Sequence, residues 1–408
     1  MDQQWIVETI NTIASMGADE SGAANRLAFT VADKEARCYV ASIMESLGMK
    51  VRIDAIGNVI GSLEGAEPQL PPVALGSHVD TVPHGGHYDG VVGVVGALAA
   101  VGRLKAAGPL RRTVEVIVFV AEESSRFSHS TMGSKAMTGS ANLNAWERAV
   151  DSQGVTFPAA LAAEGLSFEN LKQCVIAEQN YQAYLELHID QSKQLEERGA
   201  AVGVVEAIAA PTRFKMTVTG MAGHSGTTPM HDRYDALVSA SELVLAIRNI
   251  ANDHAEDDIV ATVGNLKVYP GAMNVVPGKA ELWVDLRGTD YEYIVESLQE
   301  IKDAALSIAE DYETPVTIEM LSADKPVAMD EELVALAEKA AEEVGVEWMR
   351  SVSGAGHDAM NMAKITPAGM LFVRSRDGVS HHPDEYAAPE DIEAGVQVLT
   401  VMLRRLLA

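Results

Sequence analysis

The spacing of hydrophobic positions alternates between strand-like and helix-like patterns through the first part of the chain. Residues 73–78 (VALGSH) and 113–123 (TVEVIVFVAEE) are short apolar runs, which is the pattern of strands buried on both faces of a sheet. Between them, residues 90–106 are small and apolar and predict a buried helix. Strands that alternate with helices predict an α/β fold, here a mostly parallel mixed sheet flanked by helices.

The pattern changes at about residue 210. Helical patterns lie at about 232–252 and 291–309, and strand patterns lie at 213–220, 258–270, 279–288 and 315–322. This stretch predicts an inserted α+β domain of four strands and two helices at 210–325. The alternating pattern then returns, so we expect residues 1–209 and 326–408 to form one domain into which the second is inserted.

Length, composition and charge narrow the functional classes. A chain of 408 residues has room for two domains, and no stretch approaches the ~18–20 continuous apolar residues that span a bilayer. Two cysteines are too few for a disulfide framework, so we expect a cytoplasmic protein. The net charge of −27 argues against nucleic acid or a membrane as a partner, because both need a basic face. An anionic substrate would have to be bound by locally placed arginines.

Several predicted strands end in side chains that bind metals or transfer protons. His78 ends one apolar strand, and Asp80 and Asp89 follow it within GSHVDTVPHGGHYDG. Open α/β sheets bind their ligands at the carboxyl ends of the strands. Asp89 begins the predicted helix, where a carboxylate is favoured in any case. On its own, this segment is explained as well by a capping aspartate and a loop histidine.

The other strand ends complete the pattern. Glu122 and Glu123 end the second apolar strand, His188 follows a third strand pattern, and His381 and His382 follow a fourth. A solvated strand end would explain the glutamates, and a lone histidine is more often structural than a ligand. Together, however, three imidazoles and two carboxylates at strand ends suit two divalent metal ions that share one bridging carboxylate.

The predicted inserted domain carries three further motifs, GHSGTTPMHDR (223–233), NVVPG (274–278) and VDLRG (284–288). A turn explains NVVPG, and a surface salt bridge explains Arg287 equally well. A guanidinium is nevertheless the group that grips a carboxylate with two parallel hydrogen bonds.

Taken in order along nearly the whole chain, these motifs resemble the dizinc aminoacylase/carboxypeptidase superfamily. Within it, they are most similar to the branch of N-carbamoyl-L-amino acid hydrolases, allantoate amidohydrolases and β-ureidopropionases. The matching stretches are GSHVDTVPHGGHYDG, AEESSRF, GSKAMTG, ELHIDQ, AGHSGTTPM, NVVPG, DLRG, SGAGHDA and GVSHHPDE. The resemblance implies the zinc-exopeptidase-like form of the α/β fold. It also implies that residues 1–209 and 326–408 form a catalytic, metal-binding domain and that the inserted residues 210–325 form a lid and dimerisation domain.

The resemblance also implies a ligand set. One metal ion would be held by His78, Asp89 and His188. The other would be held by Asp89, Glu123 and His381, with Asp89 bridging and His382 at a variable position of the family pattern. The cofactors would be two divalent ions per subunit, Zn²⁺ first, although Mn²⁺, Co²⁺ and Ni²⁺ tolerate the same ligands.

Catalytic and substrate-binding roles follow from the same resemblance. Glu122 would act as general base and acid, Asp80 would orient His78, and His224 would stabilise the oxyanion from the other subunit of a homodimer. The expected substrate-binding residues are Gln191, Arg213, Asn274, Arg287 and Gly356.

The implied activity is metal-dependent hydrolysis of a C–N bond in a small ureido or amide substrate that bears a carboxylate. The first candidate is hydrolysis of an N-carbamoyl-L-amino acid to the amino acid, ammonia and carbon dioxide. Allantoate amidohydrolase or N-acyl amino acid amidase is the alternative. A dipeptidase or aminopeptidase is less favoured, because the Arg287–Asn274 pair does not suit a long peptide. A non-catalytic protein on the same fold would lack the base or the ligands, which are all present.

Overall fold

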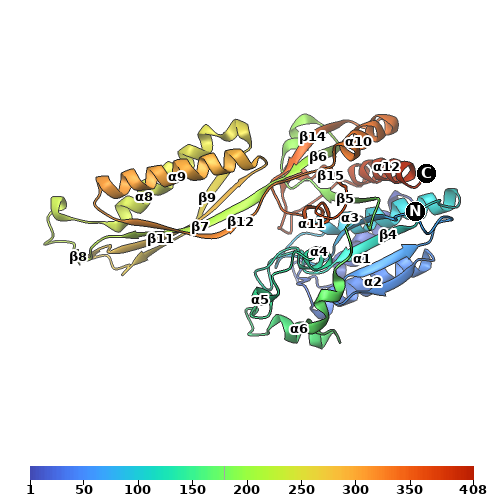
Figure 1. Ribbon diagram of the computed structural model, residues 1–408, viewed down its shortest axis with the longest axis horizontal. Coiled ribbons are helices and arrows are strands. Elements are labelled where there is room, and N and C mark those ends of the chain that lie inside the picture. The colour runs from blue at the N-terminus through green and yellow to red at the C-terminus, as the bar shows by residue number, and fades with distance from the viewer. Residues whose placement is uncertain (179) are drawn as a thin grey trace. The chain divides into compact units, whose positions relative to one another are not determined.

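The computed structural model describes residues 1–178 and 180–408, which form two compact units (Figure 1). The first unit comprises Met1–Glu206, Met329–Ser351 and Gly356–Ala408. The second unit comprises Ala207–Ala328 and Val352–Ala355.

The first unit is built on a mixed sheet. Its strands are β1 (Lys50–Ile53), β2 (Val59–Leu63), β3 (Val73–His78), β4 (Val114–Phe119), β5 (Ala183–Ile189), β6 (Val202–Ile208), β14 (Trp348–Ser353) and β15 (Ala368–Val373). They are ordered β1-β2-β4-β3-β5-β15-β6, and β14 also pairs with β6. The central strands β4, β3, β5 and β15 are parallel, whereas the pairs β1–β2, β2–β4 and β15–β6 are antiparallel. The predicted α/β fold with a mostly parallel sheet is therefore confirmed.

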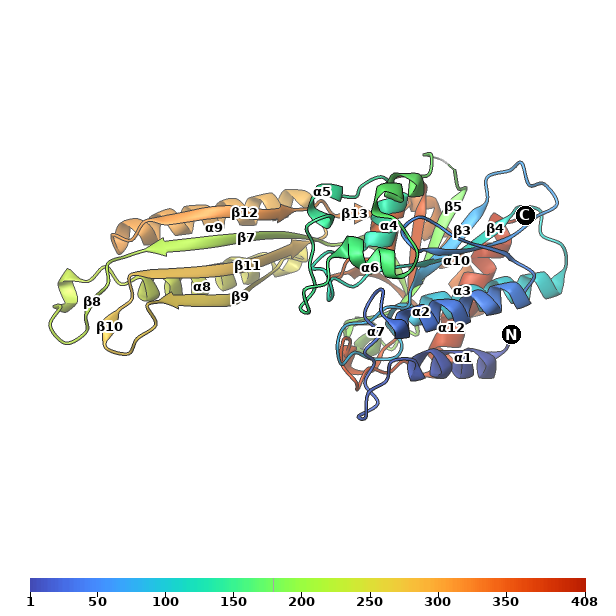
Figure 2. The same ribbon diagram turned by 90° about the horizontal axis from the view of Figure 1, so that it is seen from below.

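Helices cover both faces of this sheet. They are α1 (Gln3–Ser15), α2 (Val31–Ser46), α3 (Asp89–Ala107), α4 (Met132–Met137), α5 (Leu143–Trp146), α6 (Phe157–Ala163), α7 (Gln194–Arg198), α10 (Glu331–Val344), α11 (Asp358–Met362) and α12 (Pro389–Leu406). α3 contacts β3, β4 and β5 and packs against α1 and α12, whereas α11 contacts β5 and β15. Figure 2 shows α3 and α12 on the side of the sheet opposite α4.

The burial of α3 explains its apolar sequence. By length and composition this helix would also cross a membrane, but most of its residues are buried against the sheet and the neighbouring helices. It lies close to β5 at Gly93, where a Cβ atom would lie 2.1 Å from the carbonyl oxygen of Leu187. Because α3 begins at Asp89, this close packing helps to fix where its first residue lies.

The second unit has a four-stranded antiparallel sheet. Its strands β7 (Ala210–Thr219), β9 (Val260–Tyr269), β11 (Lys279–Gly288) and β12 (Val316–Ala323) are ordered β12-β7-β11-β9. Two helices, α8 (Ala236–Asp253) and α9 (Tyr291–Asp311), pack on one face (Figure 1). A short pair of strands, β8 (Gly223–His224) and β10 (Val275–Val276), lies beyond one end of the sheet (Figure 2). A further strand, β13 (Val327–Ala328), pairs with the end of β6.

Alternation along β7 and β11 separates a core face from a polar face. Buried and partly exposed residues alternate along both strands. The buried positions, including Phe214 and Leu286, meet the helices. Arg213, Asp285 and Arg287 therefore share the opposite face of the sheet.

The substitution Gly93→Ala tests the close packing of α3. Its new methyl group would meet the backbone of Leu187, which cannot move aside, so we expect the free energy of unfolding to fall by about 1–3 kcal/mol. In Gly96→Ala, one turn further on, the methyl group would meet only the ends of the Leu187 and Val396 side chains. This control should lie within about 1 kcal/mol of wild type. If urea denaturation shows that both variants lose the same free energy of unfolding, the packing argument is contradicted.

Candidate metal centre

The carboxyl ends of the parallel strands bring five predicted side chains together. His78 is the last residue of β3, and His188 is the penultimate residue of β5. Glu122 and Glu123 follow β4, and Asp89 is the first residue of α3. Because β4, β3 and β5 are parallel neighbours, their carboxyl ends meet at one edge of the sheet. All five side chains are buried there.

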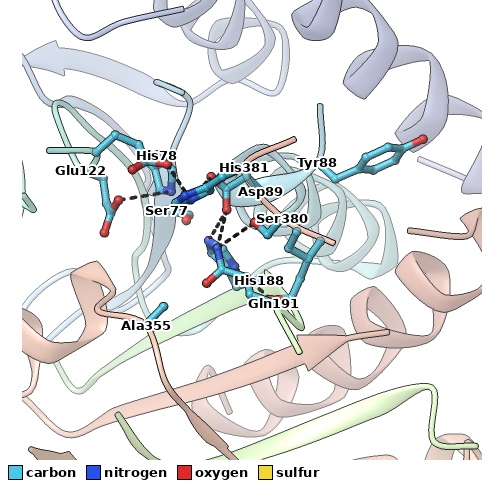
Figure 3. Close-up of polar contacts among 12 residues, drawn as sticks. Ser77, His78, Tyr88, Asp89, Glu122, His188, Gln191, Ala355, Ser380 and His381 are labelled. Carbon is cyan, nitrogen blue, oxygen red and sulfur yellow. Dashed lines mark hydrogen bonds and ion pairs between the residues drawn. The ribbon is translucent and has the colours of Figure 1, made fainter. Parts of the chain in front are cut away.

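The Asp89 carboxylate lies between two groups of ligand atoms, one near each of its oxygens (Figure 3). The first group is His78, Asp89 and His188, and the second is Asp89, Glu123 and His381. His188 Nε2 lies 3.5 Å from Asp89 Oδ1, and His381 Nε2 lies 3.7 Å from Asp89 Oδ2. Two ligands of one tetrahedral Zn²⁺ lie roughly 3.4 Å apart, given bond lengths of ~2.0–2.1 Å. The spacing therefore fits two ions that share Asp89.

Glu123 provides a test of this fit. Its Oε1 atom is buried and has no hydrogen-bond partner among residues 1–178 and 180–408. His381 Nε2 lies 3.0 Å from this oxygen, but outside the directional geometry of a hydrogen bond. A buried carboxylate oxygen without a hydrogen bond is costly unless a cation binds it. An ion held by Asp89, Glu123 and His381 would satisfy this oxygen, so the residues present fit a metal.

Backbone carbonyls orient the two buried imidazoles. His78 Nδ1 lies 3.0 Å from the carbonyl oxygen of Asp80, and His188 Nδ1 lies 3.1 Å from that of Ile189. A carbonyl only accepts hydrogen bonds, so Nδ1 carries the proton in each ring and Nε2 keeps its lone pair for a cation. Burial lowers the pKa of both His78 and His188 to about 4. Both rings are therefore neutral near pH 7, as metal ligands must be.

Asp80 differs from the prediction. We expected its carboxylate to orient His78, but Asp80 Oδ1 lies 3.7 Å from His78 Nδ1, and the nearer backbone carbonyl takes that role. The two carboxylate oxygens instead accept hydrogen bonds from the backbone N–H groups of Glu122 (3.2 Å) and Glu123 (3.1 Å). Asp80 thus holds the turn that follows β4, where Ala121 has a positive φ of 51°.

The carboxylates of the centre are poorly solvated and repel one another. Burial raises the pKa of Asp89 to about 6, and burial together with Glu123 raises the pKa of Glu122 well above its usual range. The proximity of Glu123 raises the pKa of His381 to about 9. Divalent cations among these groups would favour ionised carboxylates and a neutral His381, and would so reverse each shift.

Glu122 lies beside the first ligand group without joining it. Its Oε2 atom is 3.8 Å from His78 Nε2, and Figure 3 shows its carboxylate facing His78. A carboxylate at this position can exchange a proton with a water molecule that lies between the two ligand groups.

The two predicted substrate-binding residues of the first unit, Gln191 and Gly356, differ in their surroundings. Gln191 Nε2 donates to Asp89 Oδ1 and to Ser380 Oγ, each at 3.1 Å. Its contacts are therefore with the Asp89 carboxylate and with Ser380, the residue before His381. Gly356 is exposed in the loop before α11, and its backbone is accessible to a ligand.

In the second unit, an aspartate holds both predicted arginines. Arg287 donates through Nε to Asp285 Oδ1 (2.9 Å) and through Nη2 to Asp285 Oδ2 (3.1 Å). Arg213 Nε donates to the same Asp285 Oδ2 at 3.0 Å. Both arginines lower the pKa of Asp285 against the effect of burial. Two guanidinium groups share one carboxylate, which leaves a net positive patch on the polar face of the sheet.

The structure does not bring His224 and Asn274 to this patch. His224 lies in β8 and pairs with Val275, next to Asn274. Arg287 is close to the far end of β11, a strand of ten residues that spans about 30 Å. Arg287 and Asn274 of one subunit are therefore too far apart to hold the same small substrate. The long strands of this sheet separate them.

The hydrogen bonding of His224 favours a donor role. Its Nδ1 atom accepts a hydrogen bond from the backbone N–H of Gly226 at 3.1 Å. The neutral ring then carries its proton on Nε2. The side chain is exposed, so this N–H is accessible.

Two residues near the centre were missed in the sequence. The ring of His357 packs edge-on against His188, with centroids 4.5 Å apart, and is buried. Glu385 is buried and accepts hydrogen bonds from the backbone of Asp89 and His381. Both lie inside motifs that were noted, SGAGHDA and GVSHHPDE, but His188 and Asp89, the partners that connect them to the centre, are distant in sequence.

Comparison with known proteins identifies relatives over the whole chain. Residues 74–405 match Peptidase family M20/M25/M40. The ureidoglycolate hydrolase of Oryza sativa subsp. japonica is 38% identical over 100% of this chain and 85% of its own length. The N-carbamoyl-L-amino acid amidohydrolase of Geobacillus stearothermophilus is 37% identical over 95% of this chain and 94% of its own length. A crystal structure of an amidase of the hydantoinase/carbamoylase family from Burkholderia multivorans superimposes with a TM-score of 0.91 and 33% identity, over 100% of this chain and 98% of its own.

Substituting His381 and His382 one at a time tests which of these adjacent histidines is a metal ligand. His381 belongs to the second ligand group, whereas His382 Nδ1 accepts from the backbone N–H of Asp384 outside it. We expect His381→Ala to retain one tightly bound ion per chain and His382→Ala to retain two. The metal content after dialysis, measured by mass spectrometry, decides between them. The assignment fails if both variants lose an ion, if neither does, or if only His382→Ala does.

Proposed function

Because the chain belongs to Peptidase family M20/M25/M40 and is a metal-dependent hydrolase of C–N bonds other than peptide bonds, we propose that it hydrolyses the ureido group of a small carboxylate. The first candidate substrate is an N-carbamoyl-L-amino acid. The observation that carries the proposal is the position of Asp89, which faces an imidazole with each carboxylate oxygen. Such an arrangement suits two ions acting on one water and one carbonyl group.

The candidate substrates share one chemical core. N-carbamoyl amino acids, allantoate and ureidoglycolate each carry a carboxylate on the carbon that bears the ureido nitrogen. Ureidoglycolate enters as a second candidate because a ureidoglycolate hydrolase matches the whole chain at 38% identity. Allantoate and N-acyl amino acids remain the alternatives from the sequence, and a dipeptide is the least favoured substrate.

The proposed chemistry assigns Glu122 two proton transfers. Two divalent ions, Zn²⁺ first, would supply Lewis acidity for the attacking water and for the scissile carbonyl. Glu122 takes a proton from the water as its oxygen bonds to the ureido carbon. It then gives that proton to the leaving nitrogen as the C–N bond breaks. The carbamoyl group ends as ammonia and carbon dioxide, and the amine stays on the carboxylate product.

Carboxylate recognition falls to the two arginines of the second unit. Asp285 holds the Nε and Nη2 groups of Arg287, and the carbonyl oxygen of Gly354 accepts from its Nη1 at 3.0 Å. The guanidinium is therefore fixed in orientation before substrate arrives, which lowers the entropic cost of binding. Its remaining N–H groups and those of Arg213 would bind the substrate carboxylate.

We also propose a cytoplasmic homodimer in which His224 serves the partner's centre. His224 and Asn274 lie at the end of the second unit's sheet opposite the arginines. One small substrate could contact the two arginines and also His224 and Asn274 only if the arginines came from one subunit and His224 and Asn274 from the other. A two-fold axis would then complete both centres at once. Cys38 and Cys174 are free thiols, as a reducing cytoplasm allows.

A substrate panel tests the proposed activity. Metal-stripped protein is reloaded with Zn²⁺, Mn²⁺ or Co²⁺ and offered N-carbamoyl amino acids, allantoate, ureidoglycolate, N-acyl amino acids and dipeptides. We expect ammonia release from one of the ureido substrates. Glu122→Gln should lower kcat by about 10²–10⁴-fold while both ions stay bound. Turnover of none of the ureido compounds, or an unimpaired Glu122→Gln, rules out the proposal.

Mixed dimers test the role of His224. Glu122→Gln and His224→Ala should each be nearly inactive alone. If His224 acts across the interface, a mixed dimer has one complete centre, since the His224→Ala subunit keeps Glu122 and borrows the partner's histidine. Subunit exchange in an equal mixture should then restore roughly a quarter of wild-type activity. No recovery, despite exchange shown by differently sized tags, would mean that His224 acts within its own subunit, and full activity of His224→Ala alone would mean that it has no role.

A further inference from the structure

A buried glutamate outside both ligand groups connects the two segments that carry Asp89 and His381. Glu385 is 4% exposed and lies in the loop between β15 and α12. Its Oε1 atom accepts hydrogen bonds from the N–H groups of Tyr88 (2.8 Å) and Asp89 (3.1 Å). Its Oε2 atom accepts from Ser380 Oγ (3.2 Å) and from the N–H of His381 (3.3 Å). One carboxylate thus bonds to the backbone of two ligands from distant parts of the chain.

The start of α3 needs an acceptor from elsewhere. Its N-cap residue, Tyr88, makes no side-chain cap, and the first N–H groups of a helix have no partner within the helix. Glu385 supplies the missing acceptor and places a carboxylate at the positive end of the helix dipole. It does so at Asp89, whose side chain faces both ligand groups.

The segment that carries His381 needs support for a different reason. His381 has a φ of 57°, in the left-handed region that a residue with a Cβ atom adopts only when neighbouring groups hold it there. Its side chain is 46% exposed, so packing does little to orient the ring. The hydrogen bonds from Ser380 and from the His381 N–H to Glu385 hold this turn.

Gly86 makes room for the same carboxylate. A Cβ atom at Gly86 would lie 2.3 Å from the carboxyl carbon of Glu385. No residue other than glycine fits at that distance. The loop before α3 is therefore closed over Glu385, which explains why this carboxylate is buried.

We propose that Glu385 is a positioning residue that holds Asp89 and His381 in the geometry required by the second metal ion. The inference rests on the two-ion centre of the proposed function and adds a residue that touches neither ion. His78 and His188 are held by β3 and β5. Loss of Glu385 should therefore weaken the binding of the second ion more than the binding of the first.

Stepwise metal titration of the stripped, full-length protein tests this inference. In Glu385→Gln the amide oxygen can still accept from Tyr88 and Asp89, but the amide nitrogen cannot accept from His381. Calorimetry with Zn²⁺ should show the second ion bound about 10–100-fold more weakly and the first within about threefold of wild type. Asp384→Asn is the matched control, because its side chain is 81% exposed, and it should bind both ions as wild type does.

Cobalt adds a spectroscopic readout that a general loss of stability would not produce. The second equivalent of Co²⁺ should give a weaker visible band in Glu385→Gln, because its ligands no longer hold a regular geometry. Glu385→Ala should show the larger effect. If Glu385→Ala does not fold, the result for Glu385→Gln alone tests the proposal. Gly86→Ala should act in the same direction, because its methyl group would displace the carboxylate.

The outcomes are distinct. Wild-type protein that binds fewer than two ions contradicts the proposed function itself. Two ions in wild type with unchanged affinities in a folded Glu385→Gln overturn the positioning role alone. Equal weakening of both ions together with a lower melting temperature shows a merely structural role and overturns it as well.

Discussion

The position of one carboxylate, Asp89, between two imidazoles is the constraint on which the rest of the structure depends. Its two oxygens face His188 and His381 at 3.5 and 3.7 Å. Each imidazole is brought there by a different element, so a small shift of Asp89 would spoil both ligand groups. The parallel strands β3 and β5 supply one group, the segments after β4 and β15 supply the rest of the other, and the close contact of Gly93 with β5 sets the position of α3.

This concentration of buried acid has an electrostatic consequence. Burial raises the pKa of Asp89 to about 6, and burial also raises the pKa of Glu122 well above its usual range. The protein alone thus disfavours the ionised forms that ligands and a general base need. Cations would reverse this preference, so metal binding and the ionisation of these carboxylates are linked. Backbone N–H groups aimed at Asp80 and Glu385 stabilise the two carboxylates that lie behind the ligands.

The sequence predicted the elements better than the contacts between them. Apolar strand patterns that end in His78, Glu123 and His188 identified both the parallel sheet and the side chains at its edge, because strand direction determines where those ends meet. The carboxylate of Asp80 was assigned to the wrong partner. Its role depends on the turn at Ala121, which no periodicity reveals.

Contacts between distant segments were beyond the reach of sequence patterns. Glu385 bonds to Asp89 across most of the chain, and only the folded structure brings them together. The separation of Asn274 from Arg287 was not indicated by the sequence either. It follows from the ten-residue strand β11, which runs between them.

Anomalous diffraction from crystals grown with Zn²⁺ tests the central claim most directly. The account predicts two peaks at the zinc edge, about 3.5–4 Å apart, with one Asp89 oxygen bound to each. His78 and His188 should be the other ligands of the first zinc ion, and Glu123 and His381 should be the other ligands of the second. A single peak, or a pair that Asp89 does not join, would contradict the account.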